Sequence, residues 1–316
     1  MAVLVLCLLL VLWLPACGPK TEATPLRLGL LPIEDNFPFF VAAEENLFAR
    51  YGLNVELVPF NSARDRDMAL AAGRIDGETA DPIAVALLRK AGTAVKIVAL
   101  TMGTVPEEGR FALLAAPTSG IKAPQDLIGK SVAVSENTII EYVADQLLLA
   151  AGLDPKQVKK VPVPDMPQRL QLLVHGQVDA AVLPDPLASL AAKQGAMVIL
   201  DDTRQKENFS QVVLVFREET IEHRLAELTR LLAVYKEAAG AVAAKPEAYR
   251  ALFVEYAKIP EALKETYLAP RYAAPALPRP AELERAMQWM VTKGLLPTPY
   301  SYGELVEERV LRDLKQ

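Results

Sequence analysis

The chain has 316 residues, a hydrophobic content of 52% and a formal net charge of −5 at pH 7. This length is sufficient for one large domain or two ordinary domains with a sizeable core. Because the phosphate backbone of nucleic acids attracts cationic surfaces, an acidic chain without a block of basic residues argues against nucleic acid as a partner.

The first 17 residues form a short apolar run that ends in Leu14-Pro15-Ala16-Cys17. The run is too short to span a membrane comfortably and suits a secretory signal peptide, although no Lys or Arg precedes it. Its ending resembles the bacterial lipobox, in which the chain is cleaved before the cysteine and the thiol is lipidated. We therefore expect a signal peptide at residues 1–16, lipidation at Cys17 and a tether at residues 17–25. A buried N-terminal helix with an incidental cysteine is the alternative.

Strand and helix signals alternate along the next part of the chain. We expect strands at residues 26–31, 53–60, near 75 and at 95–100, and helices at residues 39–51, 62–72 and 82–90. Gly52 is a suitable C-terminal stop for the first of these helices. This alternation is typical of βα units that form a parallel sheet.

The alternation then begins again. We expect strands at residues 131–134, 158–163, 178–183 and 196–200, with helices after each of the first three. Apolar extended segments at residues 110–116 and 211–217 mark the joins between the two halves. Residues 220–316 are helical and interrupted by proline, and we expect them to pack back on the first lobe. The fold class is therefore α/β, with two lobes, a parallel-dominated sheet in each lobe and a cleft between them.

A short motif occurs once in each half. Gly73-Arg74-Ile75-Asp76 is followed by Asp81-Pro82, and Gly176-Gln177-Val178-Asp179 is followed by Asp185-Pro186. Each copy follows a leucine-containing helical stretch and ends with a carboxylate before proline. Ligands of open α/β sheets bind beyond the carboxyl ends of the strands. The repeat therefore predicts two similar lobes whose strand ends form a cleft.

Four phrases in this order resemble the periplasmic solute-binding proteins of ABC importers with the type II fold, within the NMT1/THI5-like and nitrate, sulfonate and taurine group (SsuA/ThiY-like). They are FFVAAE at residues 39–44, YGLNVEL at 51–57, APQDLIGK at 123–130 and GQVDAA at 176–181. The resemblance implies a first lobe from residues 26–112 and 211–316, a second lobe from residues 113–210, and hinge closure around a ligand. It also implies an extracytoplasmic, monomeric protein that needs no cofactor and has an ABC permease as its partner.

The candidate ligand residues follow the expected strands. In the first lobe they are Asp35, Asn36 and Phe37 in one loop, Ser62 and Ala63 at a helix start, and Asp81 before a proline. In the second lobe they are Ser135, Asn137 and Thr138 at a helix start, and Asp185. Free N–H groups at a helix start attract polar or anionic ligands. For each of these residues a turn or a helix cap is the alternative role.

Enzyme chemistry finds little support in the sequence. The only histidines, His175 and His223, have no spaced partner, and no cysteine remains after lipidation of Cys17, so we expect neither a metal site nor a catalytic nucleophile. An exported ligand sensor and an enzyme of the same fold are the rival classes.

The sign of the charges indicates the ligand. The expected cleft loops contain Glu34, Asp35, Asp81 and Asp185, with Arg64 as the basic residue close to them in sequence. Carboxylates accept hydrogen bonds and repel anions. We therefore expect a ligand with a hydrogen-bond donor, such as an amino-heteroaromatic thiamine precursor, on which Phe37 or Phe39 stacks. An alkanesulfonate or nitrate-like anion is the alternative.

Overall fold

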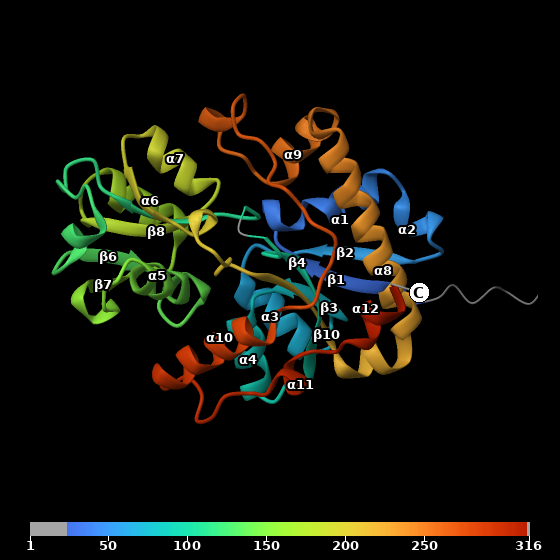
Figure 1. Cartoon of the computed structure of the whole chain (residues 1–316). Coiled ribbons are helices and arrows are strands. Elements are labelled where there is room, and N and C mark those ends of the chain that lie inside the picture. The colour runs from blue at the N-terminus through green and yellow to red at the C-terminus, as the bar shows by residue number, and fades with distance from the viewer. Residues whose placement is uncertain (1–23, 106, 315–316) are drawn as a thin grey trace, which may run out of the picture.

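The computed structural model describes residues 24–105 and 107–314, which form two α/β lobes joined by two chain crossings (Figure 1). The first sheet has the order β2-β1-β3-β10-β4 and the second has the order β7-β6-β8-β5-β9. The strands of the first sheet are β1 (Leu26–Leu30), β2 (Val55–Pro59), β3 (Gly77–Ala80), β4 (Val95–Met102) and β10 (Val212–Arg217). Those of the second are β5 (Phe111–Ala115), β6 (Ser131–Val134), β7 (Lys159–Pro162), β8 (Ala180–Pro184) and β9 (Met197–Asp201).

The two lobes have the same topology, which confirms the two-lobed α/β class. In each sheet four strands run in one direction and one strand, β10 or β5, runs antiparallel to both of its neighbours. The sheets are therefore mixed, with one antiparallel strand in each, and they agree with the expected parallel-dominated sheets. The apolar segments expected as joins are these antiparallel strands. Both are buried along almost their whole length, as their continuous apolar sequences require.

Helices cover the faces of both sheets. In the first lobe these are α1 (Phe37–Glu44), α2 (Leu47–Arg50), α3 (Ala63–Ala71), α4 (Pro82–Lys90), α8 (Glu218–Ala244), α9 (Arg250–Tyr256), α11 (Tyr302–Leu305) and α12 (Arg309–Leu314). In the second lobe they are α5 (Ile139–Ala150), α6 (Met166–Val174) and α7 (Leu187–Lys193). Short 3-10 helices are η1 (Glu34–Asn36), η2 (Pro124–Leu127), η3 (Pro155–Gln157), η4 (Asp202–Arg204), η5 (Pro246–Tyr249) and η6 (Glu261–Leu263).

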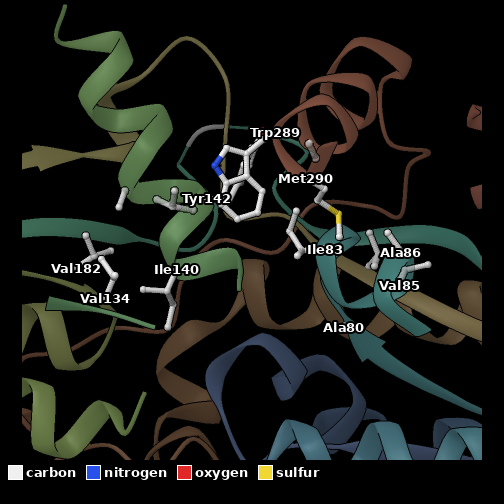
Figure 2. Close-up of a cluster of buried hydrophobic side chains, with 14 of the residues drawn as sticks. Ala80, Ile83, Val85, Ala86, Val134, Ile140, Tyr142, Val182, Trp289 and Met290 are labelled. Carbon is white, nitrogen blue, oxygen red and sulfur yellow. The ribbon is translucent and has the colours of Figure 1, made fainter. Parts of the chain in front are cut away.

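The helix α10 (Pro280–Thr292) contacts both lobes, whereas the sequence predicted contact with the first lobe alone. Figure 2 shows Trp289 of α10 beside Tyr142 of α5, while Met290 points toward Ile83 and Ala86 of α4. These side chains belong to one cluster of buried apolar residues that continues from one lobe into the other. The lobes are therefore held together on the α10 side by a shared core.

The repeated motif has a structural role at its first aspartate. Asp76 Oδ2 accepts a hydrogen bond from the backbone N–H of Arg27 at 2.7 Å, and Asp179 Oδ2 accepts one from that of Ser131 at 2.9 Å. Asp76 thus ties the start of β3 to β1, and Asp179 ties the start of β8 to the start of β6. This shared requirement explains why Gly-x-x-Asp recurs in the two lobes.

Candidate functional site

The carboxyl ends of β1 and β3 bring the first group of candidate residues together. Asn36 is 1% exposed, donates to the Leu31 carbonyl at 2.8 Å, and accepts from the Thr79 hydroxyl at 2.6 Å. These two bonds join the loop after β1 to the end of β3. The Asn36 side chain is therefore used to hold the loop in place, and Asp35, which precedes it, is half-buried at the same edge.

Phe37 and Phe39 lie in the core of the first lobe. Phe37 and Phe39 are both 0% exposed. Phe37 packs edge-on against Phe253 with ring centroids 5.0 Å apart, and Phe39 packs against Tyr235 at 5.1 Å. Both rings belong to the core beneath α8 and α9, which corrects the expectation that Phe37 or Phe39 stacks on a ligand. A sequence of clustered aromatic residues does not distinguish a core position from a cleft wall.

Ser62 caps the start of α3, which is the alternative role given for it above. The Ser62 hydroxyl accepts from the Asp65 N–H at 3.1 Å and donates to the Asp65 carboxylate at 2.8 Å, so its capping role is confirmed. Ala63 is exposed and offers only backbone groups. Arg64 is also exposed, whereas Arg66, two residues further along α3 and on the opposite face of the helix, is 5% exposed. The cation near the cleft carboxylates is therefore Arg66 and not Arg64.

Asp81 caps α4 and shares the environment of Asp35. Its Oδ1 accepts from the N–H groups of Ile83 and Ala84 at 2.9 and 3.0 Å. Burial raises the pKa of Asp81 to about 6, although these bonds and Arg66 oppose the shift. Burial likewise raises the pKa of Asp35 to about 6, again opposed by Arg66. Two carboxyl groups at the end of the first sheet are thus costly to ionise without a further cation.

Arg66 does not fully neutralise Asp35 and Asp81, because two other acidic side chains lie closer to its guanidinium. Its guanidinium lies 2.8 Å from Asp67 and 3.3 Å from Glu78, and Glu78 is fully buried. Burial raises the pKa of Glu78 to about 8 despite the arginine. The network therefore contains more acidic groups than basic ones around Arg66.

In the second lobe, the expected residues surround the start of α5. Thr138 caps the helix by accepting from the Ile140 N–H at 3.2 Å, and its hydroxyl donates to the Ser135 carbonyl at 2.7 Å. Asn137 is exposed, has a positive φ of 61°, and donates its N–H to the Glu141 carboxylate at 2.7 Å. Ser135 is 8% exposed. These residues form an ordered helix start whose local hydrogen bonds use several of their polar groups.

Asp185 is held by its own lobe. Its Oδ1 accepts from both the N–H and the hydroxyl of Ser189 at 2.9 Å, and its Oδ2 lies 3.6 Å from the Arg110 guanidinium. Arg110 also pairs with Asp201 at 2.8 Å. Burial raises the pKa of Asp185, whereas Arg110 opposes the rise. Asp185 therefore has a cation nearby, which it shares with Asp201.

Residues 257–279, here called the strap, contribute groups that the sequence did not indicate. The Tyr267 hydroxyl donates to Glu34 Oε2 at 2.6 Å, and the Tyr272 hydroxyl donates to the Glu34 carbonyl at 2.8 Å. Lys193 of α7 donates to the Ala262 carbonyl, so the strap also contacts the second lobe. Glu34 is 3% exposed, and burial together with Asp35 raises its pKa well above the usual range. The two tyrosine contacts join positions more than two hundred residues apart, and no local pattern signals them.

A small cavity lies between the lobes on the α10 side. Its lining combines Ile83 of α4, Tyr142 of α5, Gln211 before β10, and Glu282 and Arg285 of α10. The Gln211 amide donates to Glu282 at 2.6 Å, and the Arg285 guanidinium lies 5.9 Å from the centre of the Phe209 ring. Polar groups of α10 thus reach the region between the lobes, which the sequence did not predict.

Two searches of the described residues bear on the class of protein. Residues 24–105 and 107–314 contain no group of three or more His, Cys, Asp or Glu side chains arranged to hold a metal ion. In the same part of the chain, every helix is too short or too polar to cross a membrane. Cys17 lies outside the described residues.

Comparison with known proteins shows the family. Residues 34–249 match the family described as NMT1/THI5 like. An ABC transporter periplasmic binding protein of Brachyspira hyodysenteriae is 26% identical over 263 residues, which cover 77% of this chain and 73% of that protein. The match in sequence thus extends over most of both chains.

Solved structures share the fold at low identity. The periplasmic aliphatic sulphonate binding protein SsuA of Escherichia coli has a TM-score of 0.75 and 20% identity, with 90% of this chain and 98% of that chain covered. The desulfurization enzyme DSZB has a TM-score of 0.68 and 17% identity, with 92% and 98% covered. The two-lobed fold is thus found in binding proteins and also in an enzyme.

The fold and the sequence match define the class. The protein has two α/β lobes and the fold of periplasmic binding proteins. The chain belongs to the NMT1/THI5-like family.

Proposed function

We propose that this protein is the extracytoplasmic solute-binding component of an ABC importer and captures a small polar ligand for its permease. The ligand binds where the strand ends of the two lobes face each other, and the lobes rotate about the crossings to close on it. A lipid on Cys17 anchors the monomeric protein to the membrane. Support comes from the family match, the relative in Brachyspira hyodysenteriae and the lipobox-like sequence.

The ligand presents a hydrogen-bond donor or a positive charge to the first lobe. The observation that carries this proposal is the pair Asp35 and Asp81, whose pKa values are both raised to about 6 by burial while their shared cation Arg66 is already paired. A ligand ammonium or amino group supplies the missing counter-charge. An amino-heteroaromatic molecule such as a thiamine precursor is one member of this class.

Mass spectrometry of the ligand released from the purified, denatured protein tests this assignment. We expect a small amine recovered chemically unchanged. A chemically altered product would instead indicate an enzyme, and this alternative is concrete because DSZB has the same fold. Calorimetry of the released ligand with Asp35→Asn and Asp81→Asn should show weaker binding by about 1–3 kcal/mol for each variant. Glu44→Gln, which removes an exposed charge on α1, is the matched control and should bind normally.

A plain alkanesulfonate is the second candidate ligand. It is favoured by the similarity to the aliphatic sulphonate binding protein SsuA and by the polar start of α5. Tight binding of ethanesulfonate that is unaffected by Asp35→Asn and Asp81→Asn would support this candidate and reject the amine.

An exported sensor remains the third class, because such a protein also closes on a ligand. A sensor differs from an importer component in its partner, which is a receptor and not a permease. Uptake of the released ligand by cells should be lost on deletion of the protein if it serves an importer. A sensor would leave uptake intact and change only the response of the cell.

A further inference from the structure

One arginine in the second lobe is buried without a carboxylate partner. Arg169 of α6 is 0% exposed, and its Nη1 donates to the Val163 carbonyl at 3.0 Å. Its Nε and Nη2 have no hydrogen-bond partner among the described residues. Burial lowers the pKa of Arg169 to about 10, so the group is still charged at neutral pH. A buried charge with unpaired donors is expensive, and such a group calls for an explanation.

The internal repeat provides a direct comparison. When Gly73 is aligned with Gly176, Arg66 of α3 aligns with Arg169 of α6, and the cap Ser62 aligns with the cap Asp165. The two arginines therefore occupy the same helical position in the two lobes. The two arginines differ in the acidic side chains that surround them.

The partners of Arg66 are missing in the second lobe. Arg66 lies 2.8 Å from Asp67 and 3.3 Å from Glu78. The aligned positions in the second lobe hold Leu170 and Ala181, which carry no charge. The nearest acidic influence on Arg169 comes from Asp165, whose Oδ1 already accepts from the Gln168 N–H at 2.7 Å.

The position of Arg169 is at the cleft edge of its sheet. Val163, its backbone partner, directly follows β7 and donates its N–H to the carbonyl of Val134, the last residue of β6, at 2.8 Å. The next residue, Ser135, begins the segment that leads into α5. In the first lobe, Arg66 is close enough to influence both Asp35 and Asp81 at the equivalent strand ends. The guanidinium of Arg169 therefore lies behind the wall of the cleft formed by the second lobe.

We propose that Arg169 binds an oxyanion of the ligand, which is a carboxylate, sulfonate or phosphate group. Nε and Nη2 form one edge of the guanidinium, and two parallel N–H donors on one edge match the two oxygens of such a group. This inference rests on the proposed function, because it assigns the second end of the same ligand. The ligand is then dipolar, with its donor end at Asp35 and Asp81 and its oxyanion at Arg169.

This arrangement couples binding to closure. The two ends of the ligand meet opposite charges on opposite lobes, so a dipolar molecule satisfies both only when the lobes come together. The guanidinium is covered in this structure, and binding requires the side chains over its Nε–Nη2 edge to part. A purely cationic molecule would leave Arg169 unpaired, and a purely anionic one would face the carboxylates of the first lobe.

Thermal unfolding and calorimetry with three probes test the proposal. The probes are sodium ethanesulfonate, ethylphosphonate and propionate, each compared with sodium chloride at equal ionic strength. We expect at least one to stabilise the wild type and to bind Arg169→Met more weakly by roughly 10- to 150-fold. Arg169→Lys keeps the charge and loses the paired donors, so it should bind between these two extremes.

The variants also separate a binding role from a structural one. Without an anion, Arg169→Met should be at least as stable as the wild type, because it removes an unpaired buried charge. Arg66→Met, the matched variant in the first lobe, should be less stable because it leaves Asp67 and Glu78 without their cation. Failure of Arg169→Met to fold, a loss of stability without anion, or equal anion binding by wild type and variant would each overturn the proposal, as would no binding of any probe to the wild type.

The test is independent of the importer assignment. If no amine is released from the protein and uptake does not depend on it, the proposed function fails. Selective loss of anion binding in Arg169→Met would still establish the oxyanion site in that case. If instead an amine is released and Arg169→Met binds every probe normally, the proposed function stands and the assignment of Arg169 fails.

Discussion

At the scale of the residue, Asp35 and Asp81 are the groups on which the proposed chemistry depends. Both carboxyl groups lie at the end of the first sheet, and burial raises the pKa of each to about 6. Each of them is influenced by Arg66, which is engaged by Asp67 and Glu78. Their charge state therefore changes in the pH range in which a ligand cation would bind.

This environment predicts a pH-dependent affinity. In the free protein the two carboxyl groups are mostly protonated below pH 6, and a bound cation lowers their pKa by favouring the charged form. Binding of the released amine should therefore release protons near pH 5.5 and tighten as the pH rises from 5 to 7, with a plateau above. Calorimetry in buffers of different ionisation enthalpy measures both effects. Affinity that is flat over this range, or that is equally steep in the Asp35→Asn, Asp81→Asn double variant, would contradict the prediction.

Two glycines, Gly77 and Gly240, differ in the space around them and provide a second prediction at the residue scale. A Cβ on Gly77 of β3 would lie 2.3 Å from the Phe216 ring and 2.6 Å from the Val215 carbonyl, whereas one on Gly240 of α8 would meet nothing within 4 Å. Gly77→Ala should therefore destabilise the protein by about 1–3 kcal/mol through overpacking. Gly240→Ala should stabilise it by about 0.5–1 kcal/mol, because glycine is unfavourable inside a helix. Chemical denaturation of the two variants measures the difference, and equal stabilities would refute it.

At the scale of the element, α10 is the piece that connects the lobes. The Trp289 indole N–H donates to Asp145 at 2.9 Å and the ring packs edge-on against Tyr142 at 5.5 Å. Lys293, just after the helix, pairs with Glu141 of α5 at 2.7 Å. On its other side α10 packs against α4 of the first lobe. A helix encoded near the end of the chain thus contributes to the interface between two earlier units.

Trp289→Phe tests this connection. The substitution keeps an aromatic ring and removes the N–H donor, so Asp145 loses one partner and keeps its ion pair with Lys160. We expect a loss of about 1–2 kcal/mol in the free energy of unfolding. Met287→Leu, an apolar exchange of similar volume on the same helix, should cost less than about 1.5 kcal/mol. Unfolding curves that place the Trp289 variant at or above wild-type stability would show that the hydrogen bond does not hold α10.

At the scale of the whole molecule, the lobes touch on two sides. The α10 side has a continuous apolar core, whereas the strap side has the polar contact between Lys193 and the Ala262 carbonyl (Figure 1). An apolar core is costly to separate, because opening it exposes its surface to water. We therefore expect the cleft to open on the strap side, with α10 near the axis of rotation.

Small-angle scattering checks the closing motion. Protein stripped of its ligand should have a larger radius of gyration than protein saturated with it. Asp81→Asn, which weakens ligand binding, should require more ligand for the same compaction. Its radius of gyration at saturation should equal that of the wild type. An unchanged radius at saturation would exclude hinge closure of the proposed kind.

The proposed anchor is a property of the full chain. Cys17→Ser should move the protein from the membrane fraction to the soluble fraction, because stable anchoring needs the two acyl chains of a lipidated cysteine. Cys7→Ser, which lies within the expected signal peptide, is the control and should leave the protein in the membrane fraction. A Cys17→Ser protein that still sediments with membranes would refute lipid anchoring.

Some features were accessible from the sequence because they depend on near neighbours in the chain. The βα alternation, the helix caps Ser62 and Thr138, and most strand positions follow from local patterns of apolar and capping residues. The repeated Gly-x-x-Asp motif likewise indicated two lobes of the same design. These signals led to the fold class and to the family.

Other features were decided only by the tertiary structure. The sequence could not show that β5 and β10 enter the sheets antiparallel, because strand pairing joins residues far apart in the chain. The burial of Phe37, the bond from Tyr267 to Glu34, and the missing partners of Arg169 also depend on distant segments. The acidic residues near the strand ends were readable in advance. Their charge balance was not, because a carboxylate or guanidinium takes its properties from the neighbours that folding brings to it.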